Sequence, residues 1–445
     1  MSSTLFDIYE PRAAGSTFAS PDGNLQVEIK LVGFVDDVRN STNMFGQDNA
    51  PLGSLMQAAT KDSQLWHDLL LVCNQSLELP KCGYHTMAYD FDPTGKPSLL
   101  DAPESSITIK DVLGNALSIA QWPNSKAAKY LGTKKSISNQ QPQFDDLLTK
   151  CNEFARITSC SHFNRRETQV FYRAIYRLSV GYALPTCHFS EKQLKLIQNK
   201  AQRAMVAHSG YNRNTAATVL YAPSFLGGAG FFHLYDDQGY GQVKLFMKFW
   251  RSRTTTAGKL LRIAIAWAQF CAGIRSPILE DTSTKLPHLE AEWILSLRQF
   301  LQDVQGQLEL DTPFVTQLQR QGDAFLMDVA IQSGKFKPIQ LRRLNYCRLY
   351  LNVLLVSDVC NANGTELDPE AYHGSRPAVT TKHKVNQSCP NGKSWTQWRR
   401  LMYILADGSK HHRLRQPLGK WLVPADKLRK KWTHLHDGAS ERLFA

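Results

Sequence analysis

The sequence predicts an α+β fold, with short strands up to about residue 132 and mainly helices after it. Alternating apolar and polar residues over 25–35 predict a half-buried strand, and apolar residues recur with helical spacing from about residue 143. The chain of 445 residues is 42% hydrophobic and 10% aromatic, which suffices for packed cores. At roughly 150 residues per domain, this length indicates two or three domains.

The first predicted element is a strand that leads into a tight turn. Pro21-Asp22-Gly23-Asn24 predicts a turn before the strand at 25–35. Asp36 and Asp37 then interrupt the apolar pattern, and Val38 resumes it. The segment therefore predicts strand, turn and strand, with two carboxylates at the turn.

The following segments predict one helix and several short strands. Residues 51–74 carry apolar side chains near helical spacing. Residues 77–91 and 97–112 contain alternating runs, joined by the hairpin-type turn Asp92-Pro93-Thr94-Gly95. A further short strand is predicted to end at Tyr130-Leu131-Gly132.

Helices dominate the prediction for the rest of the chain. Residues 164–183 carry one apolar stripe surrounded by arginines, and Ser190 with Gln193 predicts a capping box at the start of the next helix. The stripe is Val170, Ala174, Ile175, Leu178 and Tyr182, and the arginines are Arg165, Arg166, Arg173 and Arg177. Further helices are predicted at 240–252, 258–272 and 288–304, and an irregular segment at 361–395. Asp236-Asp237 precede Gly239-Tyr240-Gly241, which predicts a loop leading into a helix.

Charge is distributed unevenly along the chain, whose formal net charge is +13. Residues 1–125 carry 7 basic and 15 acidic side chains, whereas residues 126–213 carry 15 and 5, and residues 376–445 carry 15 and 4. An acidic segment followed by basic ones suits cation binding in one part and polyanion binding in the next. The alternative is an ordinary set of basic surface patches.

Several protein classes are excluded or disfavoured by the sequence. No stretch reaches 18 consecutive apolar residues, so no membrane span is expected. The N-terminus lacks the basic and apolar regions of a secretory signal. Nine dispersed cysteines without regular spacing fit free thiols in a reducing, intracellular compartment.

Asp36 and Asp37 carry the most informative chemistry. Two adjacent carboxylates repel each other, and a bound divalent cation would offset this cost. Mg²⁺ is commonly held by one or two carboxylates together with substrate phosphates. The alternative is an exposed turn, in which Asp-Asp pairs are common. The apolar strand before the pair favours the metal site.

Gly33-Phe34-Val35-Asp36-Asp37 resembles the aromatic-x-Asp-Asp motif of reverse transcriptases of non-LTR retroelements. The downstream order is also similar. Leu79-Pro80-Lys81-Cys82-Gly83-Tyr84 resembles the lysine segment after the catalytic hairpin, Lys129-Tyr130-Leu131-Gly132 the primer grip, and the basic helices over 165–203 the thumb. The resemblance implies a partial palm over 1–132, a helical thumb-like region over 133–255, a helical connection over 256–375 and a basic Trp-containing module over 376–445.

The resemblance also implies roles for individual residues. Asp36 and Asp37 would be catalytic ligands of Mg²⁺, and Lys81 would protonate the leaving pyrophosphate. Phe34 would lie beneath the primer terminus, although it also fits a core aromatic. Nucleic acid would be contacted by Tyr130, Leu131, Gly132, Arg165, Arg166, Arg173 and Arg177. The alternatives are a surface lysine at Lys81 and an ordinary strand end at Tyr130.

The chain departs from the family in one important respect. A reverse transcriptase needs a third metal carboxylate on a strand well before the aromatic-x-Asp-Asp hairpin. Only Asp7 and Asp22 precede the motif as aspartates, and Asp22 lies in a predicted turn. We therefore expect a C-terminal fragment that has no polymerase activity by itself.

Three functional hypotheses remain open on the sequence alone. The first is a fragment of an RNA-directed DNA polymerase, whose complete form would use Mg²⁺, deoxynucleoside triphosphates, an RNA template and a DNA primer, with nuclear residence implied. The second is a non-catalytic nucleic-acid-binding protein, and the third a decayed reading frame. In the basic tail, Trp395, Trp398, Trp421 and Trp432 fit either base stacking or a small helical core.

Overall fold

The computed structural model describes most of the chain. The described residues are 5, 8–34, 37–44, 52–101, 103–212, 214–312, 314–374, 385, 387–407, 412–422, 435–437 and 442–444. For residues 33, 34, 37, 101, 435–437 and 442–444, only the backbone is described.

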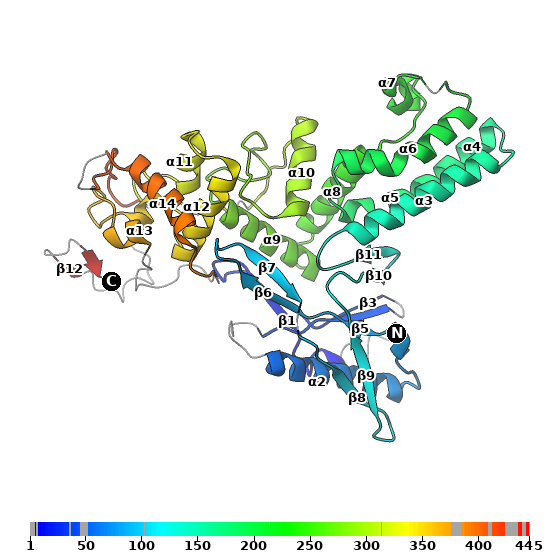
Figure 1. Ribbon diagram of the computed structural model, residues 1–445, viewed down its shortest axis with the longest axis horizontal. Helices are drawn as coiled ribbons and strands as arrows, with labels where there is room; N and C mark the ends of the chain where they lie inside the picture. Colours follow the sequence, from blue (N-terminus) through cyan, green and yellow to red (C-terminus); the bar gives the residue numbers. More distant parts are fainter. Residues whose placement is uncertain are drawn as a thin grey trace.

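The described residues mix helices with small sheets, which confirms the α+β class. Figure 1 shows the first strands and helix α2 as a lower lobe. Helices α3 to α6 extend to one side as an arm, and the C-terminal helices lie on the other side. Each sheet of the described part has only two or three strands.

The lower lobe begins with two antiparallel strand pairs. β1 (Ser16–Ala19) pairs with β2 (Gln26–Ile29), and β3 (Leu31–Phe34) pairs with β4 (Asp37–Asn40). Helix α2 (Leu52–Val72) matches the predicted helix and packs its buried Trp66, Leu69 and Leu70 against Leu31. The predicted strand–turn–strand is therefore present as the hairpin β3–β4.

The rest of the lobe consists of short strands. β8 and β9 form a three-stranded sheet with β5, while β6–β7 and β10–β11 are separate hairpins. The β6–β7 hairpin turns at residues 92–96, as the Asp-Pro-Thr-Gly sequence predicts. The elements are η1 (Leu79–Lys81), β5 (Gly83–Tyr84), β6 (Met87–Phe91), β7 (Pro97–Asp101), β8 (Ile107–Lys110), β9 (Ala116–Gln121), β10 (Ala128–Tyr130) and β11 (Thr133–Lys135).

The arm is a bundle of helices around a core of its own. α3 (Gln141–Cys160) packs along α6 (Glu191–His208), which begins with the predicted Ser190–Gln193 capping box. The remaining elements are α4 (Arg165–Phe171), the π-helix η2 (Tyr172–Tyr176), α5 (Arg177–Gly181), η3 (Leu184–Thr186), α7 (Ala217–Tyr221) and η4 (Ser224–Leu226).

The C-terminal helices share one large core. It includes Phe246 and Trp250 of α8, Leu344 of α12, and Trp398 and Leu401 of α14. The elements are α8 (Leu234–Arg251), α9 (Thr256–Ala272), α10 (Glu292–Asp303), α11 (Leu326–Gln332), α12 (Pro338–Leu351), η5 (Val356–Val359), α13 (Pro369–His373), α14 (Gly392–Leu405), β12 (Leu435–Asp437) and β13 (Arg442–Phe444).

The helix α8 starts earlier than the sequence predicts. Asp236 and Asp237 lie in its first turn, and Gly239 and Gly241 lie inside it rather than in a loop. A Cβ at Gly239 would clash with the ring of Phe300, and one at Gly241 with Pro185. These glycines permit close packing between elements, which sequence periodicity does not reveal.

Hydrogen bonds at two places attach the lower lobe to the C-terminal helices. Trp267 of α9 donates a hydrogen bond to the carbonyl of Ala19 at the end of β1, at 2.7 Å. At the β6–β7 turn, the carbonyl of Pro93 accepts a bond from the backbone N–H of Asn391, and that of Thr94 accepts one from the hydroxyl of Ser394. The hairpin β3–β4 therefore belongs to a lobe that is anchored at two places.

Candidate nucleic-acid interface

The β3–β4 hairpin carries the predicted catalytic motif. Its register pairs Phe34 with Asp37, so the two residues between them form the turn. These residues, Val35 and Asp36, lie outside the described residues, and only the backbone of Phe34 and Asp37 is described. The metal-binding and primer-stacking roles of these residues therefore stay predictions.

A buried carboxylate that the sequence analysis missed positions this hairpin. Asp62 of α2 is 3% exposed and accepts hydrogen bonds from the Thr42 hydroxyl at 2.7 Å and the Ala14 amide at 2.9 Å. Thr42 follows β4 closely, so Asp62 ties the end of the hairpin to α2. The signal was present in the sequence, because Ala58, Asp62 and Trp66 follow each other at intervals of four on the apolar face.

The described residues do not complete a metal site. Within them, no group of three or more His, Cys, Asp or Glu side chains could hold an ion. Asp22 is occupied by hydrogen bonds from Ser20 and Asn24 within its turn, and Asp7 lies outside the described residues.

Lys81 lies at the end of the short helix η1 in an exposed position. Its side chain is 77% exposed, and its Nζ lies 2.7 Å from Oε2 of Glu78 in an i,i+3 ion pair. Such an exposed pair contributes little to stability. Lys81 is exposed to solvent, and its role toward a leaving pyrophosphate stays a prediction.

The predicted primer-grip residues form a tight hairpin turn. β10 and β11 pair Tyr130 with Thr133, and both turn residues have positive φ, 48° at Leu131 and 77° at Gly132. Glycine adopts such angles readily, whereas a leucine there costs about 1–2 kcal/mol. Two-residue turns of this kind favour Asn-Gly or Asp-Gly. A strained leucine at a hairpin tip is consistent with a functional contact.

This hairpin lies close to two other predicted site elements. The guanidinium of Arg39 on β4 lies over the ring of Tyr130, 5.1 Å from its centroid. On the other side, a Cβ at Gly132 would lie 3.7 Å from the ring of Tyr182, just after α5. We call the continuous helical segment α4–η2–α5 the arginine-bearing helix. The structure therefore places the Asp-Asp hairpin, the β10–β11 hairpin and the arginine-bearing helix next to one another in this order.

Strand β11 is also fixed to the base of the arm. The amide of Lys134 donates to Oε1 of the buried Gln143 at 2.6 Å, and its ammonium lies 2.9 Å from Asp146. Although burial alone would raise it, the pKa of Asp146 is lowered by hydrogen bonds from Lys150 and Lys134. This pairing holds the β10–β11 hairpin in a defined position relative to α3.

The arginine-bearing helix buries a different face from its aliphatic stripe. Thr168, Tyr172, Tyr176 and Val180 are buried, whereas Val170, Leu178 and Tyr182 of the stripe are 59%, 67% and 61% exposed. The tyrosine rings pack on Phe154, Phe231 and Phe232, and large rings bury more area than aliphatic side chains. The π-helix at 172–176 keeps this row of four aligned.

The four predicted arginines are all exposed on this helix. Arg165 lies over the ring of Tyr211, and Arg177 lies over Phe232 and 3.7 Å from Asp237. Burial raises the pKa of Asp237, which Arg177 partly offsets. Together with the exposed Val170, Leu178 and Tyr182, the arginines form a surface that combines cations with apolar side chains.

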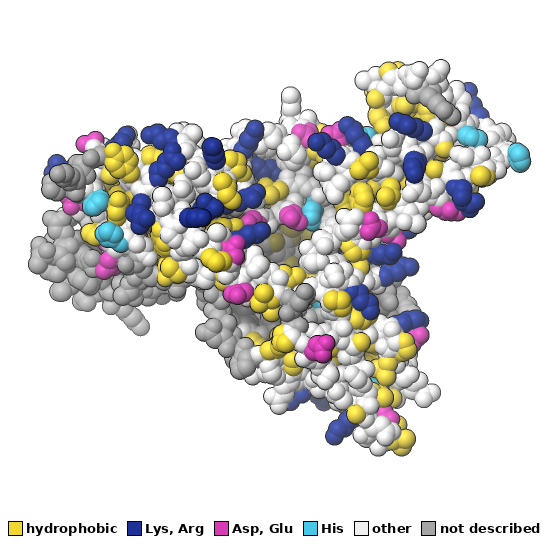
Figure 2. All heavy atoms as spheres, viewed as in Figure 1, with side chains coloured by type: hydrophobic (Ala, Val, Ile, Leu, Met, Phe, Trp, Pro, Cys, Tyr) yellow, Lys and Arg dark blue, Asp and Glu magenta, His cyan; other side chains and the backbone are white. Residues whose placement is uncertain are grey.

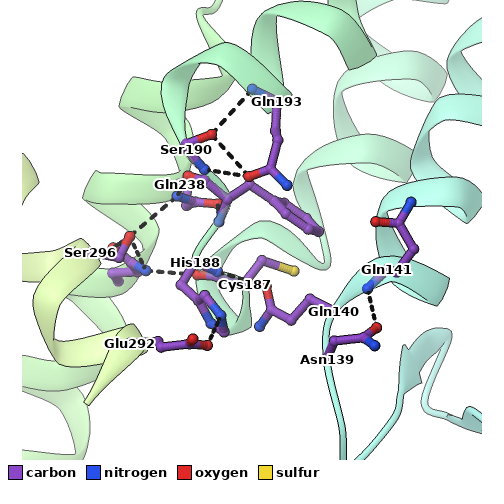
Figure 3. A network of polar contacts seen from close by, with 12 residues as sticks. Asn139, Gln140, Gln141, Cys187, His188, Ser190, Gln193, Gln238, Glu292 and Ser296 are labelled. Carbon is purple, nitrogen blue, oxygen red and sulfur yellow. Dashed lines mark hydrogen bonds and ion pairs between the residues drawn. The ribbon is translucent and has the colours of Figure 1, made fainter. Parts of the chain in front are cut away.

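A polar junction fixes the arm to the C-terminal helices (Figure 3). Gln238 of α8 accepts a hydrogen bond from the amide of Phe189 at 3.1 Å and donates one to its carbonyl at 2.9 Å. Gln140 accepts a bond from the amide of His188, whose ring lies 2.7 Å from Glu292 of α10. The segment before α6 is therefore held from both sides, which limits movement of the arm.

The tryptophans of the tail are divided between core and surface. Trp395 and Trp398 are 9% and 0% exposed and belong to the large C-terminal core. Trp421 is 49% exposed and lies against the guanidinium of Arg320, and Trp432 lies outside the described residues. The core alternative therefore holds for the first two, which cannot stack on bases.

Comparison with protein-family models, curated proteins and solved structures finds no match to this chain. In the part of the chain that the structure describes, no helix has the length and apolar character needed to cross a bilayer.

Proposed function

We propose that this chain is the C-terminal part of a reverse transcriptase of a non-LTR retroelement, and that it holds a DNA primer paired with an RNA template. One observation carries the proposal. Three motifs that lie far apart in the sequence are close in space: the Asp-Asp hairpin, the Tyr130–Gly132 turn and the arginine-bearing helix. The guanidinium of Arg39 on β4 lies over the ring of Tyr130, and a Cβ at Gly132 would lie 3.7 Å from the ring of Tyr182. A primer terminus would need these elements in that order.

The chemistry of this row suits a nucleic-acid duplex. Guanidinium groups of Arg166 and Arg173 would neutralise phosphates, which is the main source of affinity for nucleic acid. The exposed Leu178 and Tyr182 would contact the sugars in the shallow groove of an RNA-containing helix. The strained Leu131 would approach the primer backbone.

In the complete polymerase, Asp36 and Asp37 would hold Mg²⁺ and Lys81 would serve the leaving pyrophosphate. The metal site of the family that the chain resembles also uses a third carboxylate before the hairpin, where this chain has only Asp7 and Asp22 as aspartates. The proposal is therefore that this chain binds a primed template and requires a further carboxylate to extend it.

The binding part of the proposal predicts a strong effect of two exposed arginines. We expect the double variant Arg166→Gln/Arg173→Gln to bind a primer–template duplex with a logarithmic salt slope shallower by about 1.8, since each lost phosphate contact accounts for about 0.9. At 0.1 M salt this corresponds to about 60-fold weaker binding. Fluorescence anisotropy with a labelled primer across a salt series measures both values.

The matched control removes the same charge elsewhere. Lys285 and Lys335 are exposed and lie outside the arm, so Lys285→Gln/Lys335→Gln tests the effect of net charge alone. If the control weakens binding as much as the arginine variant, the arginine-bearing helix is not the binding surface.

The catalytic part is tested by primer extension with Mg²⁺ and deoxynucleoside triphosphates. We expect no extension by this chain, with salt-sensitive binding of the same primed template. Extension that is lost in Asp36→Ala would show instead that the chain contains the third carboxylate. If the chain neither extends nor binds the primed template, the proposal is wrong, and a decayed reading frame is favoured.

A further inference from the structure

The outward face of helix α6 carries a second group of cations. Lys192, Lys195, Lys200 and Arg203 are all exposed on it, with Leu196 between them at 64% exposure. We call these five residues the α6 surface. Lys195 pairs with Glu191, whereas no described carboxylate pairs with Lys192, Lys200 or Arg203. Figure 2 shows Lys and Arg side chains distributed over this arm.

The spacing of these cations has a cost in the free protein. Lys192 and Lys195, and likewise Lys200 and Arg203, are three residues apart and lie next to each other on the helix. Like charges at this spacing destabilise a helix by about 0.2–0.5 kcal/mol per pair. A polyanion bound along the surface would offset this repulsion, because each cation would be attracted to a phosphate. From Lys192 to Arg203 the helix rises about 17 Å, the length of several consecutive phosphates of one strand.

A hollow lies on each side of the α6 surface. The first, of about 580 Å³, is lined by Lys200, Arg203, Arg156, Ser159 and Asn214. The second, of about 720 Å³, is lined by Lys192, Lys195, Leu196 and Tyr221, and also by Glu191, the ion-pair partner of Lys195. Cations with a neighbouring aromatic ring and an exposed leucine are the combination that holds single-stranded nucleic acid.

The α6 surface is separate from the arginine-bearing helix. α3 meets that helix through Phe154, whose ring centroid lies 5.5 Å from that of Tyr176. Arg156, which lines the first hollow, follows two residues later and so points about 200° away around the helix axis. Figure 1 shows α6 along the side of the arm farther from β10–β11. One duplex therefore cannot lie flat on both surfaces.

We propose that the α6 surface binds an unpaired nucleic-acid strand, independently of the primer–template duplex on the other side of the arm. The phosphates would follow Lys192, Lys200 and Arg203, and bases would enter the hollows beside Leu196 and Tyr221. A template strand that leaves the duplex could reach this surface only as a single strand.

The test compares two ligands and two charge variants. For Lys200→Gln/Arg203→Gln we expect the binding of a 30-nucleotide single-stranded RNA to show a logarithmic salt slope shallower by about 1.4, hence about 25-fold weaker binding at 0.1 M salt. The binding of a short blunt primer–template duplex should be unchanged. Lys285→Gln/Lys335→Gln again serves as the control of equal charge.

The arginine variant completes the design. Arg166→Gln/Arg173→Gln should weaken duplex binding and leave single-strand binding unchanged, so failure of the proposed duplex site does not affect the conclusion about α6. If the α6 variant matches the charge control on single-stranded RNA, or weakens both ligands equally, the independent α6 site is refuted.

Discussion

Replacing Arg348 with methionine is expected to lower the free energy of unfolding by about 3–5 kcal/mol. Arg348 of α12 is fully buried, and its guanidinium donates hydrogen bonds to the carbonyls of Phe270 at 2.8 Å, Cys271 at 3.1 Å and Val353 at 3.3 Å. A fourth bond joins Nε to Asn345 at 2.8 Å. Methionine fills much of the space but removes these donors; the carbonyl of Cys271 keeps only its bond from Asn345 at 3.1 Å.

The opposite outcome, no loss of stability in Arg348→Met, also has a physical basis. Buried ion pairs can often be replaced by apolar residues at no loss, because burying a charge is costly. Here desolvation lowers the pKa of Arg348 to about 10, which shows that this cost is present. However, three of the bonds go to backbone carbonyls, two at the end of α9 and one at Val353 after α12. These carbonyls stay in place after the substitution. The unsatisfied acceptors should therefore dominate.

Urea unfolding of the full chain measures this effect. Arg399→Met, at an exposed position of α14, is the matched control and should change stability by less than about 0.5 kcal/mol. Equal stability of the two variants would show that the end of α9 does not depend on Arg348. The result also bears on function, because α9 anchors β1 through Trp267 and so supports the lobe with the Asp-Asp hairpin.

Local signals predicted much of the fold. The hairpins β3–β4 and β6–β7, helix α2 and the Ser190–Gln193 cap each depend on residues close in sequence, so turn chemistry and periodicity were sufficient. The strand end at Tyr130-Leu131-Gly132 was also predicted, although not the hairpin turn with two positive φ angles.

Features that depend on distant partners were not predicted. Residues 168–182 contain two rows at intervals of four, and the rings of Phe154, Phe231 and Phe232 on other segments cover the tyrosine row. The start of α8 depends on Phe300 and Pro185, which fit against Gly239 and Gly241. The burial of Arg348 cannot be predicted from the sequence nearby, because its partners Phe270 and Cys271 lie 78 and 77 positions earlier.

The candidate site shows the same division. The sequence named the motif residues, whereas their order in space depends on Arg39, which stacks on Tyr130, and on Asp62, which holds Thr42. Both residues act between elements and carry no motif of their own. The cations of α6 were present in the sequence as well, but only the two hollows distinguish them from an ordinary solvated helix face.

The second large effect is a loss of stability in mild acid caused by His288. This residue is 2% exposed and its Nε2 donates to the carbonyl of Ala272 at 2.8 Å. Burial, together with repulsion from Arg348 and Arg342, lowers the pKa of His288 to about 4, although the hydrogen bond to Ala272 opposes this shift. The unfolded chain takes up this proton near pH 6.5, whereas the folded chain does so near pH 4.

The sign of the effect follows from that difference. Between about pH 6.5 and pH 4 the unfolded state binds one more proton, so stability falls as the pH falls, by about 3 kcal/mol over the window. His288→Gln keeps an amide donor for Ala272 but does not titrate. The wild-type protein should therefore lose stability relative to His288→Gln by up to about 1.4 kcal/mol per pH unit in this window.

Urea unfolding of both proteins at half-unit steps from pH 4 to pH 8 measures the difference, in which the other titrating groups cancel. His162→Gln, at an exposed position after α3, is the control for replacing a histidine by glutamine. A stability difference between wild type and His288→Gln that stays constant across this pH range would contradict the prediction. It would mean that the folded protein protonates His288 as readily as the unfolded chain does. The C-terminal end of α9 would then have to accommodate an imidazolium beside the guanidinium of Arg348. The carbonyls of Phe270 and Cys271 there already accept hydrogen bonds from Arg348 and Asn345, so they offer little stabilisation to a second cation.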